Sequence, residues 1–180
     1  MIKAIFLDRD GTINKDSGHV HKIEDLVILD KVIEGLKLFQ EMGYFPIIVT
    51  NQAGIGKGYY QEKDFQNFNN SLVRHLKKHG IKIEQTYFCP HAPKEECLCR
   101  KPNVDLLYQA KGDYNINFEE SYFIGDKNTD ILAGKKVGCK TLLVLTGETK
   151  NHLEARKCSP DFIAKNLLDA ARWVKEESKL

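Results

Sequence analysis

Short apolar runs alternate with amphipathic segments along this chain. Six of the runs have the length and composition of strands buried in a sheet. They span residues 4–7, 45–49, 86–88, 122–124, 141–145 and, as the weakest signal, 162–164. Between them, apolar residues recur at helical spacing. Strands that alternate with helices predict an α/β, Rossmann-like fold, in which helices cover both faces of a central parallel sheet.

Glycines mark the ends of two predicted helices. The first helix repeats apolar residues from Val32 to Phe39 and stops at Gly43, and the second repeats them from Phe65 to Leu76 and stops at Gly80. Glycine just after the last apolar position commonly ends a helix. Three further helices are predicted over residues 104–110, 130–137 and 167–174.

Composition narrows the class of protein. A length of 180 residues predicts one domain, residues 1–180, and 42% hydrophobic with 29% charged residues is ordinary for a globular protein. The net charge of +2 gives no reason to expect nucleic acid or an anionic membrane as partner. No leader sequence and no apolar run of membrane-spanning length is visible, so we expect a cytoplasmic protein. Nothing suggests an exposed apolar patch, so we expect a monomer.

Two segments are too long for ordinary connections between a strand and a helix. One spans residues 11–29, and the other is a loop rich in cysteine, proline and charge, residues 89–102. Long loops in compact domains are usually functional. Neither segment is long enough to form a separate cap domain, so the strand ends are expected to be comparatively open.

Acidic residues follow two of the predicted strands. Asp8 and Asp10 come directly after residues 4–7, while Asp126 and Asp130 follow residues 122–124. The carboxyl ends of parallel strands meet at one edge of a sheet, where such folds bind ligands, so these carboxylates can converge. Carboxylate oxygens suit Mg²⁺, which keeps water ligands that phosphate oxygens can replace. Asp130 has an alternative role at the N-terminus of the predicted helix.

Two further segments have the residue types that bind anions. Thr50 ends the second predicted strand and is followed by a glycine-rich stretch, residues 53–58. A hydroxyl and backbone N–H groups can hold an anion there, and a flexible turn explains the glycines equally well. The spacing is not that of a P-loop, so ATP binding is not indicated. Arg100 and Lys101 precede a helix, where lysine commonly binds phosphate.

These motifs, in this order, resemble the haloacid dehalogenase (HAD) superfamily of aspartate-dependent phosphatases. The resemblance implies that Asp8 is the nucleophile and that Asp10 is the general acid and then the base. It also implies that Thr50 and Lys101 hold the phosphoryl oxygens. Mg²⁺ would be bound by Asp126, the Asp8 side chain and the Asp10 carbonyl. Because Asp10 lies beside anionic Asp8 and the incoming phosphate, we expect a raised pKa for Asp10 in the free site.

The cysteine-rich loop predicts a structural zinc site. Its ligands would be Cys89, His91, Cys97 and Cys99, in the pattern Cys-x-His-x₅-Cys-x-Cys. Three thiolates and one imidazole form a closed tetrahedral site with no open position for catalysis. The loop ends at Arg100 and Lys101, so zinc would position the phosphate-binding lysine. The alternative is a metal-free surface loop with cysteines present by chance.

The loop and its neighbours look like the heptose-bisphosphate phosphatase branch of the superfamily, and also like the neighbouring histidinol-phosphatase branch. The segment 16–30 and the stretch "NQAGIGKG" favour the heptose branch, whereas the loop 89–102 reads nearly as well as that of a histidinol phosphatase. The resemblance implies a small sugar phosphate as substrate. The residues implied to contact it are Asp16, Ser17, Gly18, His19, Thr50, Asn51, Gln52, Ala53, Arg100, Lys101 and Lys127.

The best substrate hypothesis is D-glycero-D-manno-heptose 1,7-bisphosphate, cleaved at C7 during the synthesis of lipopolysaccharide precursors. Histidinol phosphate is the alternative substrate. A mutase is a weaker alternative, because the chain lacks the cap that protects a phosphoenzyme from water. A non-catalytic, zinc-stabilised binding module is weaker still, because such a module needs none of Asp8, Asp10, Thr50, Lys101 and Asp126. His19 could also be an exposed residue of a hairpin.

Overall fold

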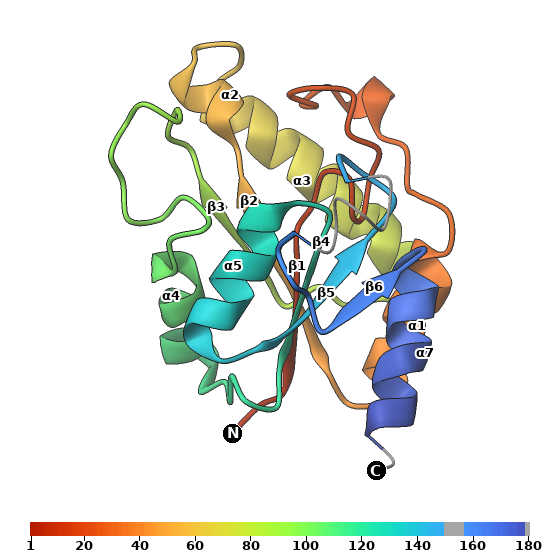
Figure 1. The fold of residues 1–180 in the computed structure, drawn as a ribbon. Helices are drawn as coiled ribbons and strands as arrows, with labels where there is room; N and C mark the ends of the chain where they lie inside the picture. The colour runs from red at the N-terminus through yellow and green to blue at the C-terminus, as the bar shows by residue number, and fades with distance from the viewer. Residues whose placement is uncertain (150–156, 179–180) are drawn as a thin grey trace.

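Six parallel strands form a single sheet in the computed structural model, which describes residues 1–149 and 157–178 (Figure 1). The strands are β1 (Ala4–Leu7), β2 (Phe45–Asn51), β3 (Gln85–Cys89), β4 (Tyr122–Gly125), β5 (Lys140–Val144) and β6 (Phe162–Ala164). Their order across the sheet is β3-β2-β1-β4-β5-β6. The predicted α/β fold is confirmed. Each strand end predicted from the apolar runs lies within two residues of the strand end in the structure.

Helices cover both faces of this sheet. They are α1 (Val32–Glu41), α2 (Ala53–Gly56), α3 (Glu62–Lys78), α4 (Asp105–Tyr114), α5 (Asn128–Val137) and α7 (Leu167–Glu177). Helix α1 ends just before Gly43 and α3 just before Gly80, and both glycines have a φ of +80°. The left-handed conformation, which glycine adopts without strain, ends these helices as predicted. None of the described helices is long and apolar enough to cross a membrane.

The alternation of side chains along β1 divides the apolar core into two layers. Ile5 and Leu7 pack in one cluster with buried residues of α1, α3 and α7. Ala4 and Phe6 pack in the other cluster with buried residues of α4 and α5. Figure 1 shows α1 and α7 side by side at one edge of the molecule, with α4 and α5 on the opposite face of the sheet. All four β1 residues are fully buried, so the central strand is rigidly held.

The order of strands reverses at β1, which pairs with β2 on one side and β4 on the other. Ligands of open α/β sheets bind at such a reversal, beyond the carboxyl ends of the strands. The two long connections lie at this same edge. Residues 8–31 connect β1 to α1 and include a 3₁₀ turn at Ile23–Asp25. Residues 90–104 connect β3 to α4, and no segment of the described chain forms a separate cap domain.

Candidate active site

Two acidic residues surround one lysine at the carboxyl edge of the sheet. Asp8 follows β1, Asp130 lies in the first turn of α5, and Lys101 lies near the end of the long connection between β3 and α4. The Nζ atom of Lys101 lies 2.8 Å from Asp8 Oδ1 and 2.7 Å from Asp130 Oδ1, and all three side chains are buried. Burial alone would lower the pKa of Lys101, but the charges of Asp130 and Asp8 raise it. Lys101 is therefore a cation in contact with the Asp8 carboxylate.

Lys101 is held through both its backbone and its side chain. Asn51, the last residue of β2, donates from Nδ2 to the Lys101 carbonyl at 3.1 Å and accepts from the Lys101 backbone N–H at 3.0 Å. Nζ of Lys101 also donates to the carbonyl of Val49 at 2.6 Å. Buried Thr50 lies between these two β2 residues and lines the same cleft as Asp8 and Lys101. The structure thus brings together the residues expected to hold a phosphoryl group.

Three carboxylates crowd together beside Lys101 and fit a divalent cation. One oxygen each from Asp8, Asp126 and Asp130 lies within 4.8 Å of the others. Burial, with the charges of Asp8 and Asp130, raises the pKa of Asp126 to about 8, and its buried Oδ1 has no hydrogen-bond partner among the described residues. Burial also raises the pKa of Asp130 to about 6, although Lys101 opposes it. Such an oxygen cluster suits Mg²⁺.

Asp130 serves two purposes in this arrangement. Its Oδ2 accepts a hydrogen bond from the backbone N–H of Lys127 at 3.0 Å, which caps α5. Its Oδ1 forms the ion pair with Lys101 at 2.7 Å. The sequence left open whether Asp130 joins the acidic cluster or caps the helix, and in the structure it does both.

Asp10 has different partners from Asp8. Arg9 donates to both of its carboxylate oxygens, from Nε at 2.9 Å and from Nη2 at 2.8 Å. Asn14 donates to Oδ1 at 2.9 Å and Gln52 to Oδ2 at 3.0 Å. Burial alone would raise the pKa of Asp10, but the Arg9 charge and these hydrogen bonds lower it. The expectation of a raised pKa in the free site is wrong, because it considered Asp8 and ignored Arg9.

A cavity in two adjoining parts lies at these strand ends. The inner part has a volume of about 30 Å³ and is lined by Asp8, Thr50 and Lys101, among others. The outer part has a volume of about 470 Å³, which is within the range of small-molecule sites. Both parts share wall residues: Asp10, Asn51, Lys127 and Thr129. Asp8 therefore lies at the inner end of a cavity of ligand size.

Nearly all of the residues expected to contact substrate line this cavity. Thr50 and Lys101 line the inner part, whereas Ser17 is exposed and lines neither part. The others line the outer part: Asp16, Gly18, His19, Asn51, Gln52, Ala53, Arg100 and Lys127.

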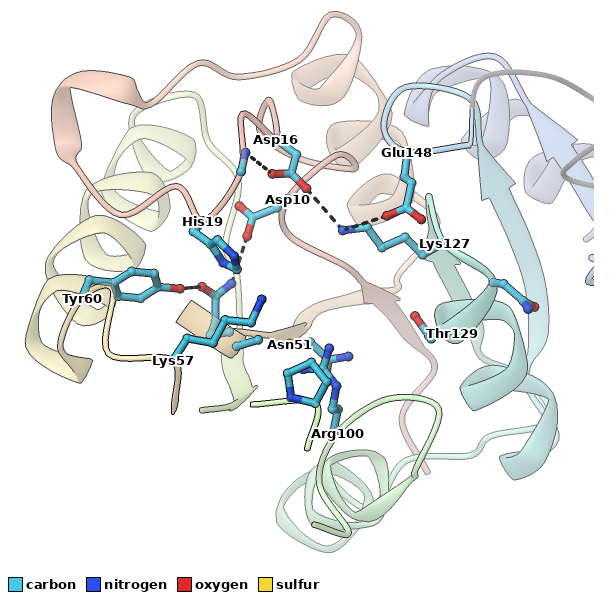
Figure 2. A pocket seen from close by; sticks show the side chains of 15 residues that line it. Asp10, Asp16, His19, Asn51, Lys57, Tyr60, Arg100, Lys127, Thr129 and Glu148 are labelled. Atoms are coloured by element: carbon cyan, nitrogen blue, oxygen red, sulfur yellow. Dashed lines mark hydrogen bonds and ion pairs between the residues drawn. The ribbon is translucent and has the colours of Figure 1, made fainter. Parts of the chain in front are cut away.

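Three cations reach the outer cavity from three different loops. Figure 2 shows Lys57, Arg100 and Lys127 pointing into it. Lys127 also bridges two acidic residues of the wall, with Nζ 3.3 Å from Asp16 Oδ2 and 4.0 Å from Glu148 Oε2. Burial would lower the pKa of Lys127, but the charges of the surrounding aspartates raise it well above its ordinary value. Lys57 and Arg100 form no ion pair among the described residues, so these two cations of the wall are available to an anionic ligand.

The segment after β1 covers part of the cavity through aromatic contacts. The ring of His19 lies edge-on to Tyr59, with 4.9 Å between centroids, and its pKa is lowered by burial and by the charge of Lys57. The ring of His21 stacks on Tyr60 at 4.5 Å and does not line the cavity. His19 is therefore placed to meet a ligand, while His21 fixes the segment.

The glycine-rich stretch after β2 is ordered by close packing. Residues Ala53–Gly56 form the single helical turn α2. A Cβ atom at Gly54 would lie 2.1 Å from the ring of Tyr60, and one at Gly56 would lie 2.4 Å from the backbone nitrogen of Ala92. These contacts leave no room for larger side chains. The sequence suggested either an anion-binding segment or a flexible turn. Close packing explains these two glycines without either hypothesis.

The four residues proposed to bind zinc lie together. Cys89 Sγ is 3.6 Å from both Cys97 Sγ and His91 Nδ1, and Cys97 and Cys99 Sγ are also 3.6 Å apart. Tetrahedral zinc with Zn–S bonds of about 2.3 Å places its sulfurs roughly 3.8 Å apart. Cys89, Cys97 and Cys99 form no disulfide in the described structure. The geometry therefore fits a zinc ion better than a disulfide.

Several residues of the site were missed from the sequence. Arg9 and Asn14 hold Asp10, and Tyr60 donates from its hydroxyl to Gln52 Oε1 at 2.6 Å. Lys57 and Glu148 line the outer cavity. A signal existed for Arg9, which lies two residues beyond Leu7 and so follows the alternation of Ile5 and Leu7, the β1 residues that pack against α1, α3 and α7. A charge in that position is expected to be buried and paired.

Comparison with known proteins identifies the family. A model described as HAD-hydrolase-like matches residues 98–170. A D-glycero-α-D-manno-heptose-1,7-bisphosphate 7-phosphatase of Photorhabdus laumondii is 44% identical, over 96% of this chain and 97% of its own length. The chain belongs to this phosphatase family. Two relatives named for the β anomer, from Haemophilus ducreyi and Helicobacter pylori, are 39% and 42% identical over 96% of the chain.

Solved structures of heptose-bisphosphate phosphatases have the same fold. The enzyme from B. bronchiseptica, whose crystal structure is a complex with magnesium and phosphate, superposes with a TM-score of 0.90 and 24% identity, over 98% of this chain and 99% of the other. The Burkholderia thailandensis enzyme gives a TM-score of 0.72 at 26% identity, over 94% and 96% of the two chains. The resemblance to HAD phosphatases seen in the sequence is confirmed.

Proposed function

We propose that this protein is a Mg²⁺-dependent phosphomonoesterase that removes the 7-phosphate of D-glycero-D-manno-heptose 1,7-bisphosphate. The product would supply the synthesis of lipopolysaccharide precursors. One observation supports the chemistry most directly: buried Asp8 contacts the Lys101 ammonium at 2.8 Å at the inner end of a cavity of ligand size. The substrate follows from relatives that are about 40% identical over nearly the whole chain.

In the first step, a carboxylate oxygen of Asp8 attacks phosphorus. The bond between phosphorus and the sugar oxygen breaks, and Asp10 gives its proton to that oxygen. Lys101 and the Thr50 hydroxyl hold the phosphoryl oxygens, and the Lys101 charge offsets the repulsion between two anions. The product is an aspartyl phosphate, and one difficult displacement is thereby split into two easier ones.

In the second step, water hydrolyses the aspartyl phosphate. Asp10, now ionised, takes a proton from the attacking water, the bond between Asp8 and phosphorus breaks, and phosphate leaves. The lowered pKa of Asp10 in the free protein suits this role as a base. For the first step Asp10 must gain a proton, and the negative charge of the bound phosphate raises its pKa for that purpose.

Mg²⁺ would be bound by Asp8, Asp126 and the backbone carbonyl of Asp10, with Asp130 close by. When bound, it neutralises charge that develops on the phosphoryl oxygens. The crowded carboxylates of Asp8, Asp126 and Asp130 supply the attraction for a cation. Burial, and then the charges of neighbouring carboxylates, raises the pKa values of Asp126 and Asp130, and a bound cation would offset this cost of ionising them.

Magnesium is expected to stabilise the protein more above pH 8 than below pH 6. The pKa of Asp126 in the folded, metal-free protein is about 8, above its ordinary value of 3.8. A raised pKa contributes stability at low pH, and this contribution is lost as pH rises through about 8. Mg²⁺ binds the ionised form and restores the lost stability. Thermal unfolding measured with Mg²⁺ and with EDTA, from below pH 6 to above pH 8, tests this expectation. An equal rise in Tm with Mg²⁺ at every pH would contradict it.

A structural Zn²⁺ would be bound by Cys89, His91, Cys97 and Cys99, whose ligand atoms lie within 4.8 Å of one another. The loop they close packs against the segment after β2, because the backbone N–H of Gly56 donates to the carbonyl of Pro90 at 2.8 Å. Zinc would thereby order the loop that ends at Lys101, without taking part in chemistry.

Replacing Cys97 with serine is expected to remove zinc and lower both Tm and kcat. Metal analysis of the unchanged protein should find about one zinc per chain, since four ligands form one closed site. Cys139→Ser is the matched control, because Cys139 is a buried cysteine outside the loop and should leave the zinc content unchanged. Undiminished zinc in the Cys97→Ser protein would exclude this site.

The heptose assignment is tested by the position of cleavage. ³¹P NMR of heptose 1,7-bisphosphate incubated with protein and Mg²⁺ should show loss of the C7 phosphomonoester signal and retention of the C1 signal. Separate reactions with the α and β anomers would show which one this chain prefers, since relatives named for each match at similar identity. Loss of the C1 signal first would overturn the assignment.

A further inference from the structure

Arg9 is a fully buried charge between the two acidic residues that follow β1, and the mechanism above gives it no role. Its guanidinium lies over two aromatic rings of α3, 4.6 Å from the centroid of Phe68 and 5.3 Å from that of Phe65. A buried charge is strongly unfavourable unless it is paired with good geometry. The position of Arg9 therefore depends on its partners.

The principal partner of Arg9 is Asp10. The Nε and Nη2 atoms donate to the two different carboxylate oxygens, at 2.9 and 2.8 Å. This forked arrangement fixes the plane of a carboxylate, which a single donor cannot do. Asn14 and Gln52 donate to the same two oxygens from other directions. Rotation of the Asp10 carboxylate would break several of these bonds at once.

The same guanidinium contacts two other parts of the site. Nη2 of Arg9 donates to the carbonyl of Val20, in the segment that covers the cavity, at 3.1 Å. It also lies 3.3 Å from Gln52 Oε1, and Gln52 Nε2 donates to Thr50 Oγ1 at 2.9 Å. Arg9 thus connects the proton-transferring carboxylate with the covering segment and with a residue that would hold the phosphoryl group.

We propose that Arg9 is a positioning residue for Asp10. It holds the carboxylate in one orientation, toward the oxygen that leaves the substrate. Because Arg9 also donates to the Val20 carbonyl, this orientation depends on the position of the covering segment. This inference rests on the proposed function, in which Asp10 transfers the proton. Cleavage of a substrate whose poor leaving group must be protonated should depend on Arg9. Cleavage of a substrate whose leaving group departs without a proton should not depend on Arg9.

Arg9→Lys tests this dependence with two substrates. Lysine keeps the charge but cannot hold a carboxylate with two parallel hydrogen bonds. With an alkyl phosphate, whose alcohol must be protonated, we expect kcat to fall by about 10²-fold while KM changes little. With p-nitrophenyl phosphate, which leaves without a proton, the burst of nitrophenolate should keep its rate. Equal losses with both substrates, or no loss with either, would overturn the proposal.

Two controls separate this proposal from the proposed function. Asp10→Asn should show the same dependence on the leaving group. If Asp10→Asn instead lowers the rates with the alkyl phosphate and with p-nitrophenyl phosphate equally, Asp10 is not the general acid. Arg9 then has no acid to position. Val174→Ala removes buried apolar atoms from α7. It should lower Tm without changing the ratio of the two rates, which distinguishes positioning from lost stability.

A measurement on the unchanged protein covers the case in which Arg9→Lys does not fold. The Arg9 Nε–H resonance should be protected from exchange with solvent, because this group is buried and donates to Asp10. The resonance should shift when Asp10 is replaced with asparagine. If the resonance exchanges rapidly and has the same chemical shift in the Asp10→Asn protein, Arg9 does not hold the Asp10 carboxylate in solution.

Discussion

Asp8→Asn is expected to lower kcat by at least about 10⁴-fold and to leave the protein folded. An asparagine amide cannot attack phosphorus to form the acyl phosphate, so the covalent route is lost. Asparagine keeps the shape of the side chain and can still accept a hydrogen bond from Lys101, which lies 2.8 Å from Asp8 Oδ1. The loss should appear in single-turnover measurements as well as in the steady state.

Asp113→Asn is the matched control for this change. Asp113 is an exposed acidic residue outside the site, where it accepts a hydrogen bond from the Tyr87 hydroxyl at 2.6 Å. Its replacement should leave kcat nearly unchanged. Circular dichroism and Tm should show that both variants are folded. An Asp8→Asn protein with its original activity would show that Asp8 is not the nucleophile.

Lys101→Met is expected to lower kcat by about 10²–10³-fold and the free energy of unfolding by about 3 kcal/mol. The first effect arises because Lys101 would hold a phosphoryl oxygen. The second arises because Asp8 and Asp130, with side chains 5% and 1% exposed, would lose their buried cationic partner. Methionine has a similar length, so little packing is lost.

The loss of stability in the Lys101→Met protein should be largest in EDTA, because a bound divalent cation compensates part of the missing lysine charge. Denaturant unfolding with EDTA or Mg²⁺ therefore accompanies the kinetic measurement. Lys78→Met, at the exposed end of α3, is the control and should change neither quantity. A Lys101→Met protein of unchanged stability in EDTA would contradict the buried ion pairs described for Lys101.

The fold and the convergence of the acidic residues could be predicted because both depend on local pattern. Continuous apolar runs identify buried strands, and parallel topology brings the ends of those strands to one edge. Asp8 and Asp126 are far apart in sequence and were still expected together for this reason, whereas the resemblance to HAD phosphatases placed Lys101 with them. The same reasoning predicted that Cys89 and Cys99 lie close, because they flank one short loop.

The surroundings of each side chain could not be predicted in this way. The pKa of Asp10 depends on Arg9, its neighbour in sequence, and on Gln52, which follows another strand, β2. The wall of the outer cavity likewise takes Lys57 and Glu148 from separate loops. Such contacts depend on rotamers and on packing between distant segments, which hydrophobic periodicity does not encode.

The most direct test of the account compares kcat/KM for heptose 1,7-bisphosphate and histidinol phosphate, with Mg²⁺ and one preparation of protein. Lys57 and Arg100 line the outer cavity without an ion pair among the described residues, and they favour a second phosphate over the cationic amine of histidinol phosphate. We expect the bisphosphate to be preferred by at least about tenfold, which corresponds to about 1.4 kcal/mol. A preference for histidinol phosphate would contradict the proposed function and place the protein in histidine biosynthesis.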